Sequence, residues 1–241
     1  MHWRYDVTGV DTVTLHFGER IDLALVERIQ QAAEALQGSL TDRLLDAVPS
    51  YTTLLLRYDL LQDDLASLMA DVAATLNRLP AEPAPRSAAD LIEVPVWYDL
   101  RVGPDLPRIA RQAGLTVPQV IELHCSQPYH VFAIGFAPGF AYLGEVPAQL
   151  ATPRLATPRA KVPAGTLGIA DTQTALYPMM SPGGWNLIGR TPLTLFDPQR
   201  TPASFLNAGQ QVRFRAIDAA EYRALGGRVD DLPWQSGGCD D

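Results

Sequence analysis

The sequence contains few of the residues that build metal centres or disulfide frameworks. Its 241 residues include two cysteines and four histidines, and none of them has the spacing of an HExxH motif or of a paired-cysteine metal site. We therefore predict no metal site. Cys125 and Cys239 lie far apart in the chain, so we expect both to be free thiols in a reducing cytoplasm.

Basic residues and long apolar runs are also scarce. Lysine and arginine together number 19 against 27 aspartate and glutamate residues, which gives a formal net charge of −8 at pH 7. Proteins that bind nucleic acid or anionic membranes usually carry basic stripes, so we expect neither as a partner. No apolar run is long enough to span a bilayer, and the first residues lack the pattern of a signal peptide. We therefore predict a cytoplasmic protein.

The N-terminal part of the chain has the pattern of a small α/β domain. Apolar and polar residues alternate over residues 10–17, as in a half-buried strand, and residues 22–38 have the cap, apolar spacing and final glycine of a helix. Strand-forming residues follow over 45–58, and we expect Asp63 to cap a second amphipathic helix. With a further strand at Leu91–Trp97, this order predicts a ferredoxin-like split β-α-β sandwich.

A proline-rich stretch at residues 79–89 predicts a linker, because proline blocks helix continuation and favours extended chain. From Tyr129 onward the segments are short, rich in strand formers and separated by glycine and proline, which predicts a barrel or sandwich. The predicted class is therefore α+β with two domains. The expected bounds are 1–88 for the N-terminal domain, 89–235 for the β-rich domain and 236–241 for a disordered tail.

Two segments combine rigid backbone with aromatic or basic side chains. Residues 135–143 interleave glycine and proline with aromatic rings, and Gly139 could permit close approach of a ligand. A barrel corner with the rings in the core explains the same pattern. Residues 153–165 place two arginines and a lysine on a proline-stiffened loop, which favours anion binding over a solvated loop whose arginines pair with surface carboxylates.

A third segment, residues 181–192, contains Gly183 and Gly184 followed by Trp185. The glycines could offer backbone N–H groups as an anion nest, and the indole could form a flat apolar wall. A tight turn packed under the tryptophan is the alternative. No Gly-x-Ser-x-Gly elbow is present, and a single histidine such as His124 is more often a structural hydrogen-bonding residue than a catalyst.

Several of these residues together resemble the KipI / allophanate hydrolase subunit 1 family, whose bacterial members include the B subunit of 5-oxoprolinase. The resemblance covers nearly the whole chain and rests on Gly103–Leu106, His124, Gly135–Leu143, Pro158–Gly165, Gln173, Tyr177–Pro178 and Ser181–Trp185. The chain departs from the family pattern at Asp171 and Ala175, where glycines are expected.

The resemblance implies a cyclophilin-like β-barrel as the C-terminal domain. It also implies that the chain is one component, inactive alone, of an ATP-dependent 5-oxoprolinase that converts 5-oxoproline to glutamate. The 5-oxoprolinase subunits A and C would be its partners, and the C subunit would bind directly to form a heterodimer. ATP with Mg²⁺ would bind at a site shared with that partner.

The candidate site residues fall into two groups. The candidate catalytic residues are Arg159, His124 and Arg154. The candidate residues for binding substrate or nucleotide are Phe136, Gly139, Phe140, Tyr142, Lys161, Gln173, Tyr177, Gly183, Gly184, Trp185 and Arg190. The cations would hold a substrate carboxylate and a transferring phosphoryl group, and the aromatic rings would exclude water.

Three other functions stay open. A KipI-like protein would inhibit a sensor histidine kinase by binding it, and aromatic and arginine residues are also what protein interfaces favour. The chain could instead be half of a biotin-dependent urea or amide carboxyltransferase. A stand-alone peptidyl-prolyl isomerase rests only on analogy with the expected fold.

Overall fold

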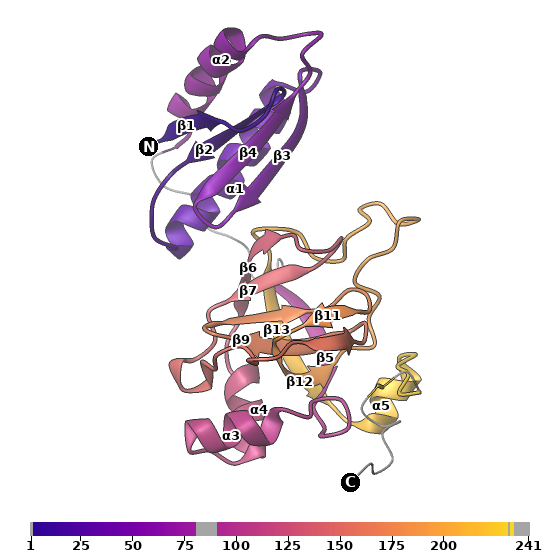
Figure 1. Cartoon of the computed structure of the whole chain (residues 1–241). Coiled ribbons are helices and arrows are strands. Elements are labelled where there is room, and N and C mark those ends of the chain that lie inside the picture. The colour runs from indigo at the N-terminus through magenta and orange to yellow at the C-terminus, as the bar shows by residue number, and fades with distance from the viewer. Residues whose placement is uncertain (1, 81–90, 231, 234–241) are drawn as a thin grey trace. The chain divides into compact units, whose positions relative to one another are not determined.

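The computed structural model describes residues 2–80, 91–230 and 232–233. The chain divides into two compact units, Met1–Arg86 and Ser87–Asp241 (Figure 1). The boundary expected between residues 88 and 89 lies outside the described residues, and so do most of the expected linker and the expected tail at 236–241. We describe each unit by itself.

The first unit consists of one sheet and two helices. Its elements are β1 (Arg4–Val7), β2 (Thr12–His16), α1 (Leu23–Ser39), β3 (Leu44–Ser50), β4 (Thr53–Tyr58) and α2 (Leu65–Asn77). The sheet has the order β1-β2-β4-β3 with antiparallel neighbours, so β2 and β3 run parallel on either side of β4. Alternate residues of β2 and β4 pack with the apolar faces of α1 and α2 in one core.

Two expectations for the first unit need correction. The predicted strand Leu91–Trp97 is β5 and belongs to the second unit, where it pairs with β12 and β13. It therefore does not complete the sheet of the first unit, whose edge next to β2 is formed by β1. The ferredoxin-like assignment stays a prediction.

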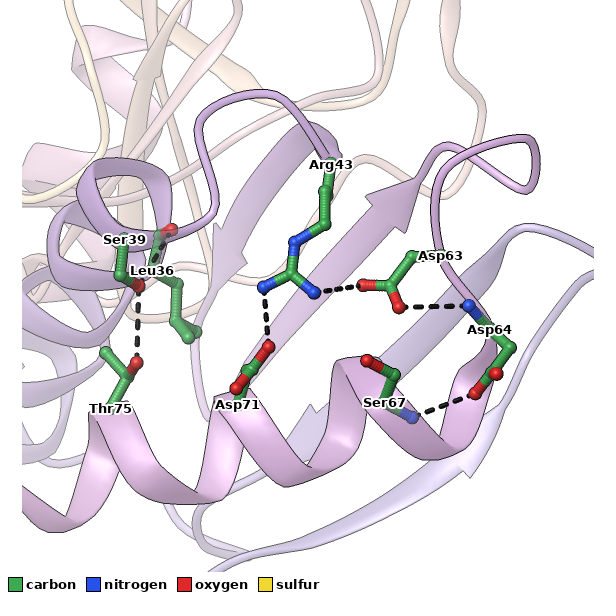
Figure 2. Close-up of polar contacts among 8 residues, drawn as sticks. All are labelled: Leu36, Ser39, Arg43, Asp63, Asp64, Ser67, Asp71 and Thr75. Atoms are coloured by element: carbon green, nitrogen blue, oxygen red, sulfur yellow. Dashed lines mark hydrogen bonds and ion pairs between the residues drawn. The ribbon is translucent and has the colours of Figure 1, made fainter.

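The cap of α2 is Asp64 instead of Asp63, because the Asp64 side chain accepts a hydrogen bond from the Ser67 backbone N–H. Asp63 has another role. Its carboxylate, only 2% exposed, pairs with the Arg43 guanidinium at 3.0 Å, and that guanidinium also pairs with Asp71 of α2 at 2.5 Å (Figure 2). The arginine thereby ties the turn before β3 to the helix.

The second unit is built around a closed barrel of seven strands. Its elements are β5 (Leu91–Trp97), α3 (Leu106–Ala113), α4 (Val117–Cys125), β6 (Tyr129–Ile134), β7 (Ala141–Gly144), η2 (Ala148–Leu150), β8 (Arg159–Val162), β9 (Thr166–Ala170), β10 (Gln173–Leu176), β11 (Ser181–Gly183), β12 (Asn186–Arg190), β13 (Gln211–Ile217) and α5 (Ala219–Ala224). The barrel order is β6-β13-β5-β12-β9-β10-β7, and β6 pairs with β7 to close it. The prediction of a β-barrel in this part of the chain is confirmed.

The barrel core explains the apolar character of its strands. Every residue of β9 and β12 is buried, and these strands share a core with β6, β13 and the apolar sides of α3 and α4. The two helices lie side by side at one end of the barrel (Figure 1). Strands β8 and β11 pair with each other as a separate ribbon. No helix in the described part of the chain combines the length and hydropathy needed to cross a bilayer.

Candidate functional site

A hollow of about 210 Å³ lies beside the β8–β11 ribbon, and we call it the aromatic hollow. Its lining residues are Phe136, Phe140, Tyr142, Arg154, Pro158, Tyr177, Pro182, Gly183, Gly184 and Trp185. All of these residues except Pro158 and Pro182 are candidate site residues in the sequence analysis. The fold therefore brings together residues from the three segments that the sequence singled out, although these segments are separated along the chain.

Phe140 is the central ring of the hollow. It is 2% exposed, and its ring centroid lies 4.8 Å from that of Tyr142 and 5.3 Å from that of Tyr177, both in edge-to-face geometry. The Trp185 ring lies 6.0 Å away in the same kind of contact. Edge-to-face pairs stabilise a particular arrangement of rings beyond simple burial. The inner walls are therefore preformed, and the exposed ring of Phe136 stands at the same hollow.

Tyr177 explains why Gly183 must lack a side chain. The tyrosine is fully buried, and its hydroxyl group lies so close to Gly183 that a Cβ atom there would overlap it. Burial raises the pKa of Tyr177 to about 12, and the nearby Trp185 backbone opposes that rise. The hydroxyl group is therefore neutral at physiological pH.

The predicted anion nest at the two glycines is not formed. A nest alternates residues of right-handed and left-handed conformation, but neither Gly183 nor Gly184 has a positive φ. Gly183 is part of the extended strand β11, where it pairs with Arg159 of β8. Gly183 instead packs closely against Tyr177, and Gly184 lies against Pro158.

Arg154 is the one basic side chain among the described residues that lines the aromatic hollow. Its guanidinium lies over the Trp185 ring, with the central carbon 5.7 Å from the ring centroid. Burial raises the pKa of Tyr142, and the nearby Arg154 charge opposes that rise. No carboxylate of the described residues pairs with this arginine, and none lines the hollow. Its charge is thus available to an anionic ligand.

Arg159 is placed differently from the sequence expectation. Its Nη2 donates to the Asp105 carboxylate at 2.9 Å, and its Nη1 donates to the Trp185 carbonyl at 3.4 Å. The second oxygen of Asp105 accepts a hydrogen bond from the Leu187 backbone N–H at 2.7 Å. The charge of Arg159 is thus already paired, and through Asp105 and the Trp185 carbonyl it holds the start of β12 and the residue before it. Arg159 is not among the residues that line the hollow. Its contacts are those of a positioning residue, and its catalytic role stays a prediction.

A second polar contact fixes the same strand from α3. Arg108 donates to the Asn186 side-chain oxygen at 2.6 Å, and the Asn186 amide donates to the carbonyl groups of Pro153 and Ile169 at 3.0 Å each. The buried Asn186 thus links α3, β9 and the loop that carries Arg154. The sequence did not single out Arg108, because nothing in its spacing relates it to a residue 78 positions later.

His124 lies away from the aromatic hollow. Its ring is fully buried, stacks on Tyr129 and is hydrogen-bonded to the hydroxyl groups of Tyr98 at 2.9 Å and Thr174 at 3.2 Å. Burial lowers its pKa to about 3, so the imidazole is neutral. A fully enclosed ring cannot reach a ligand in the hollow, so the structure corrects the catalytic assignment in favour of the structural alternative.

The remaining candidates also lie outside the aromatic hollow. Arg190 is buried and donates to the carbonyl groups of Ala164 and Arg228 at 2.8 Å each. Gly139 has a φ of +77° and packs against Phe196, so it serves the turn. Lys161 is exposed on β8, and Gln173 begins β10. Within the described residues, no group of three or more histidine, cysteine, aspartate or glutamate side chains could hold a metal ion.

Comparison with known proteins places this chain in a family. The chain belongs to the family described as carboxyltransferase domain, subdomain C and D, which matches residues 3–206. The B subunit of 5-oxoprolinase from Bacillus subtilis (strain 168) is 34% identical over 232 residues, which cover 93% of this chain and 97% of that protein. The protein of the same name from Escherichia coli O157:H7 is 42% identical over 209 residues, covering 86% of this chain and 92% of that protein.

A solved structure agrees with these matches. The crystal structure of TTHA0988 in space group P212121 has a TM-score of 0.75 and 38% sequence identity, and the match covers 86% of this chain. It covers only 40% of TTHA0988, so this chain spans less than half the length of that protein. Together these matches confirm the predicted relation to a family whose members include B subunits of 5-oxoprolinase.

Proposed function

We propose that this protein is the B subunit of an ATP-dependent 5-oxoprolinase complex, which opens the lactam ring of 5-oxoproline to give glutamate. The observation that carries the proposal is the near full-length match to proteins named as that component in two organisms. The aromatic hollow supports it, because it combines apolar walls with one guanidinium that has no carboxylate partner among the described residues.

The chemistry suits such a site. The amide of a lactam is stabilised by resonance, so water attacks it slowly, and ATP would supply the driving force by activating the amide oxygen. The task of this chain would be to bind and orient the substrate in a place from which bulk water is excluded. The rings of Phe140, Tyr142 and Trp185 provide the apolar surface, and Arg154 provides the charge for the substrate carboxylate.

ATP with Mg²⁺ does not fit the aromatic hollow. Among the described residues, the lining offers one guanidinium for a triphosphate and no carboxylate for a divalent cation. The volume of the hollow is also below the roughly 300–1,000 Å³ of pockets that hold drug-sized ligands. We therefore place the nucleotide outside the hollow, at a surface shared with a partner protein.

The 5-oxoprolinase subunits A and C are the proposed partners, with the C subunit in direct contact. The length of TTHA0988 supports this arrangement, because more than half of that protein lies beyond the part that matches this chain. An isolated chain that lacks such a partner would bind substrate without turning it over. The kinase-inhibitor and biotin-dependent carboxyltransferase hypotheses are not favoured, since the relatives matched over nearly their whole length are named as B subunits of 5-oxoprolinase.

The experiment is an ATPase assay that depends on 5-oxoproline, performed with subunits A, B and C together and then with each omitted in turn. We expect glutamate and ADP to form together only in the complete set. Wild-type turnover without this chain would refute the assignment, and turnover by this chain alone would refute its role as an incomplete catalyst.

A further inference from the structure

Phe136 has an unusual backbone conformation. Its φ is +67°, and it is one of three non-glycine residues with a positive φ among the residues that the structure describes. The region is unfavourable for L-residues with large side chains, because the Cβ atom comes too close to the following carbonyl oxygen. The conformation is held by a tight turn, in which the Gly135 N–H donates to the Phe140 carbonyl and the Phe140 N–H donates to the Ala137 carbonyl, each at 3.0 Å.

The side chain of Phe136 is also in an unfavourable place. It is 66% exposed to solvent, although it lines the aromatic hollow and its ring lies 5.2 Å from that of Phe140 in edge-to-face geometry. The strained backbone costs stability in the unliganded protein, and the exposed phenyl ring offsets little of that cost, because it buries little apolar area. Such costs persist mainly where the residue has a task other than stability.

The residues that line the hollow indicate which kind of ligand the Phe136 ring can cover. The deeper wall of the hollow is made of Phe140, Tyr177 and Trp185, which are buried and fixed by mutual ring contacts. These rings offer a preformed apolar surface of fixed shape, which suits a small ring-shaped ligand. Arg154 adds one positive charge. Arg154 is the one basic side chain and no acidic side chain of the described residues lines the hollow, so a second carboxylate or an ammonium group would find no ion-pair partner there.

We propose that the aromatic hollow binds a small planar ring that carries a single carboxylate, and that Phe136 determines specificity by covering the ring while Arg154 pairs with the carboxylate. The identity of the ligand rests on the proposed function, since 5-oxoproline has this composition. The open-chain product glutamate has an ammonium group and a second carboxylate, so the same features disfavour it. The site therefore selects the closed ring and releases the opened chain.

The test measures binding to the full-length chain by NMR titration with three probes, namely 5-oxoproline, 2-pyrrolidinone and glutamate. 2-Pyrrolidinone has the ring without the carboxylate, and glutamate has the carboxylate without the ring. We expect saturable binding of 5-oxoproline and at least tenfold weaker binding of the other two. Equal binding of 2-pyrrolidinone, equal binding of glutamate, or no saturable binding of 5-oxoproline overturns the proposal.

Variants separate the role of the Phe136 ring from a structural role. Phe136→Gly removes the ring and allows the positive φ, so we expect at least a tenfold loss of affinity for 5-oxoproline while the melting temperature stays within about 3 °C of wild type. Phe136→Leu keeps the strained backbone and loses the aromatic face, and we expect a similar loss of affinity. Asp171→Gly is the matched control, because Asp171 has a φ of +52° and does not line the hollow. It should keep full affinity.

The outcomes are distinct from those of the turnover assay. Wild-type affinity in both Phe136 variants overturns the inference, even if the complete complex hydrolyses 5-oxoproline. Loss of affinity in these variants supports the inference, even if the complex shows no turnover and the proposed function fails. A variant that binds 5-oxoproline normally but no longer assembles with the partner proteins would show that Phe136 is an interface residue, and this result also overturns the inference.

Discussion

Replacing Asp105 by alanine should destabilise the protein and weaken binding at the aromatic hollow, because this carboxylate holds the start of β12, directly after Trp185. Asp105 is 8% exposed and accepts two hydrogen bonds, one from Arg159 at 2.9 Å and one from the Leu187 backbone N–H at 2.7 Å. Alanine would leave the backbone N–H unsatisfied inside the fold and the guanidinium without its counter-charge.

The expected magnitude follows from these two contacts. A hydrogen bond to a charged group contributes about 1.5–3 kcal/mol. Breaking a fully buried ion pair costs about 3–5 kcal/mol, but the Arg159 side chain is 25% exposed, so we discount this contribution to about 1 kcal/mol. The total is about 3 kcal/mol, and at roughly 2–4 °C per kcal/mol the melting temperature should fall by about 6–12 °C. Asp105→Asn keeps an acceptor for Leu187 and should lose about half as much.

The assay is urea denaturation together with 5-oxoproline titration, and Glu93→Ala is the control. The Glu93–Arg215 pair is exposed on both sides, at 58% and 41%, so its removal should shift the unfolding midpoint much less than Asp105→Ala does. Equal unfolding midpoints for Asp105→Ala and Glu93→Ala would refute the reasoning. A double variant adds a second check. Arg159 also donates to the Trp185 carbonyl at 3.4 Å, so Arg159→Met should reduce affinity somewhat further in the Asp105→Ala background, but by less than it does in the wild type.

Three further predictions concern other parts of the fold. Burial lowers the pKa of His124 in the folded state to about 3, so the unfolded state binds more protons below about pH 6.5. The stability of the fold should therefore decrease by about 2 kcal/mol between pH 7 and pH 5. In urea denaturation, His124→Gln should lose less stability over that pH range. Gly183→Ala should lower the free energy of unfolding by about 1–3 kcal/mol and weaken ligand binding, because its Cβ would overlap Tyr177. The Cβ of Gly184→Ala would make only ordinary contacts, so this variant should keep nearly the wild-type melting temperature and ligand affinity. Arg43→Met should lower the urea midpoint of the first unit, because it leaves the buried Asp63 carboxylate unpaired (Figure 2), and it should not change ligand affinity.

Each of these predictions can fail clearly. An unchanged pH dependence in His124→Gln would mean that this ring is not the group that destabilises the fold in acid. A Gly183→Ala variant as stable as Gly184→Ala would mean that the close contact with Tyr177 can relax without cost. For Arg43, the control is Arg57→Met, since the Arg57 side chain is 55% exposed in its pair with Asp11. Equal stability of the two arginine variants would contradict the argument from burial.

The local sequence signals were sufficient for most elements of the fold. Alternation over residues 10–17 and helical spacing after Asp22 correspond to β2 and α1, because burial of one face imposes the period of each element. The short strands separated by glycine and proline predicted a barrel or a sandwich, and the family resemblance selected the barrel. The assignment of Leu91–Trp97 to a ferredoxin-like sheet failed, because a strand's own residues do not specify which sheet it joins. That choice depends on its pairing with β13, about 120 residues further along the chain.

The left-handed positions illustrate the same limit. The family pattern expects glycine at position 171, and the structure shows why, since Asp171 there has a φ of +52°. Aspartate tolerates that conformation better than most residues, so the turn between β9 and β10 survives the departure. No local signal predicted the positive φ of Phe136. A bulky residue rarely adopts that conformation, and the glycine directly before it would be the expected place for a positive φ.

The sequence by itself determined the residue types at the site, since the aromatic rings, glycines and arginines of the three segments are visible as local composition. Only the tertiary structure decided which of them work together. It placed Arg154 at the hollow, committed Arg159 to Asp105 and enclosed His124 and Arg190 in the fold. The physical reason is that the environment of a charged side chain is set by contacts across strands and helices far apart in the chain, and such contacts have no local signature.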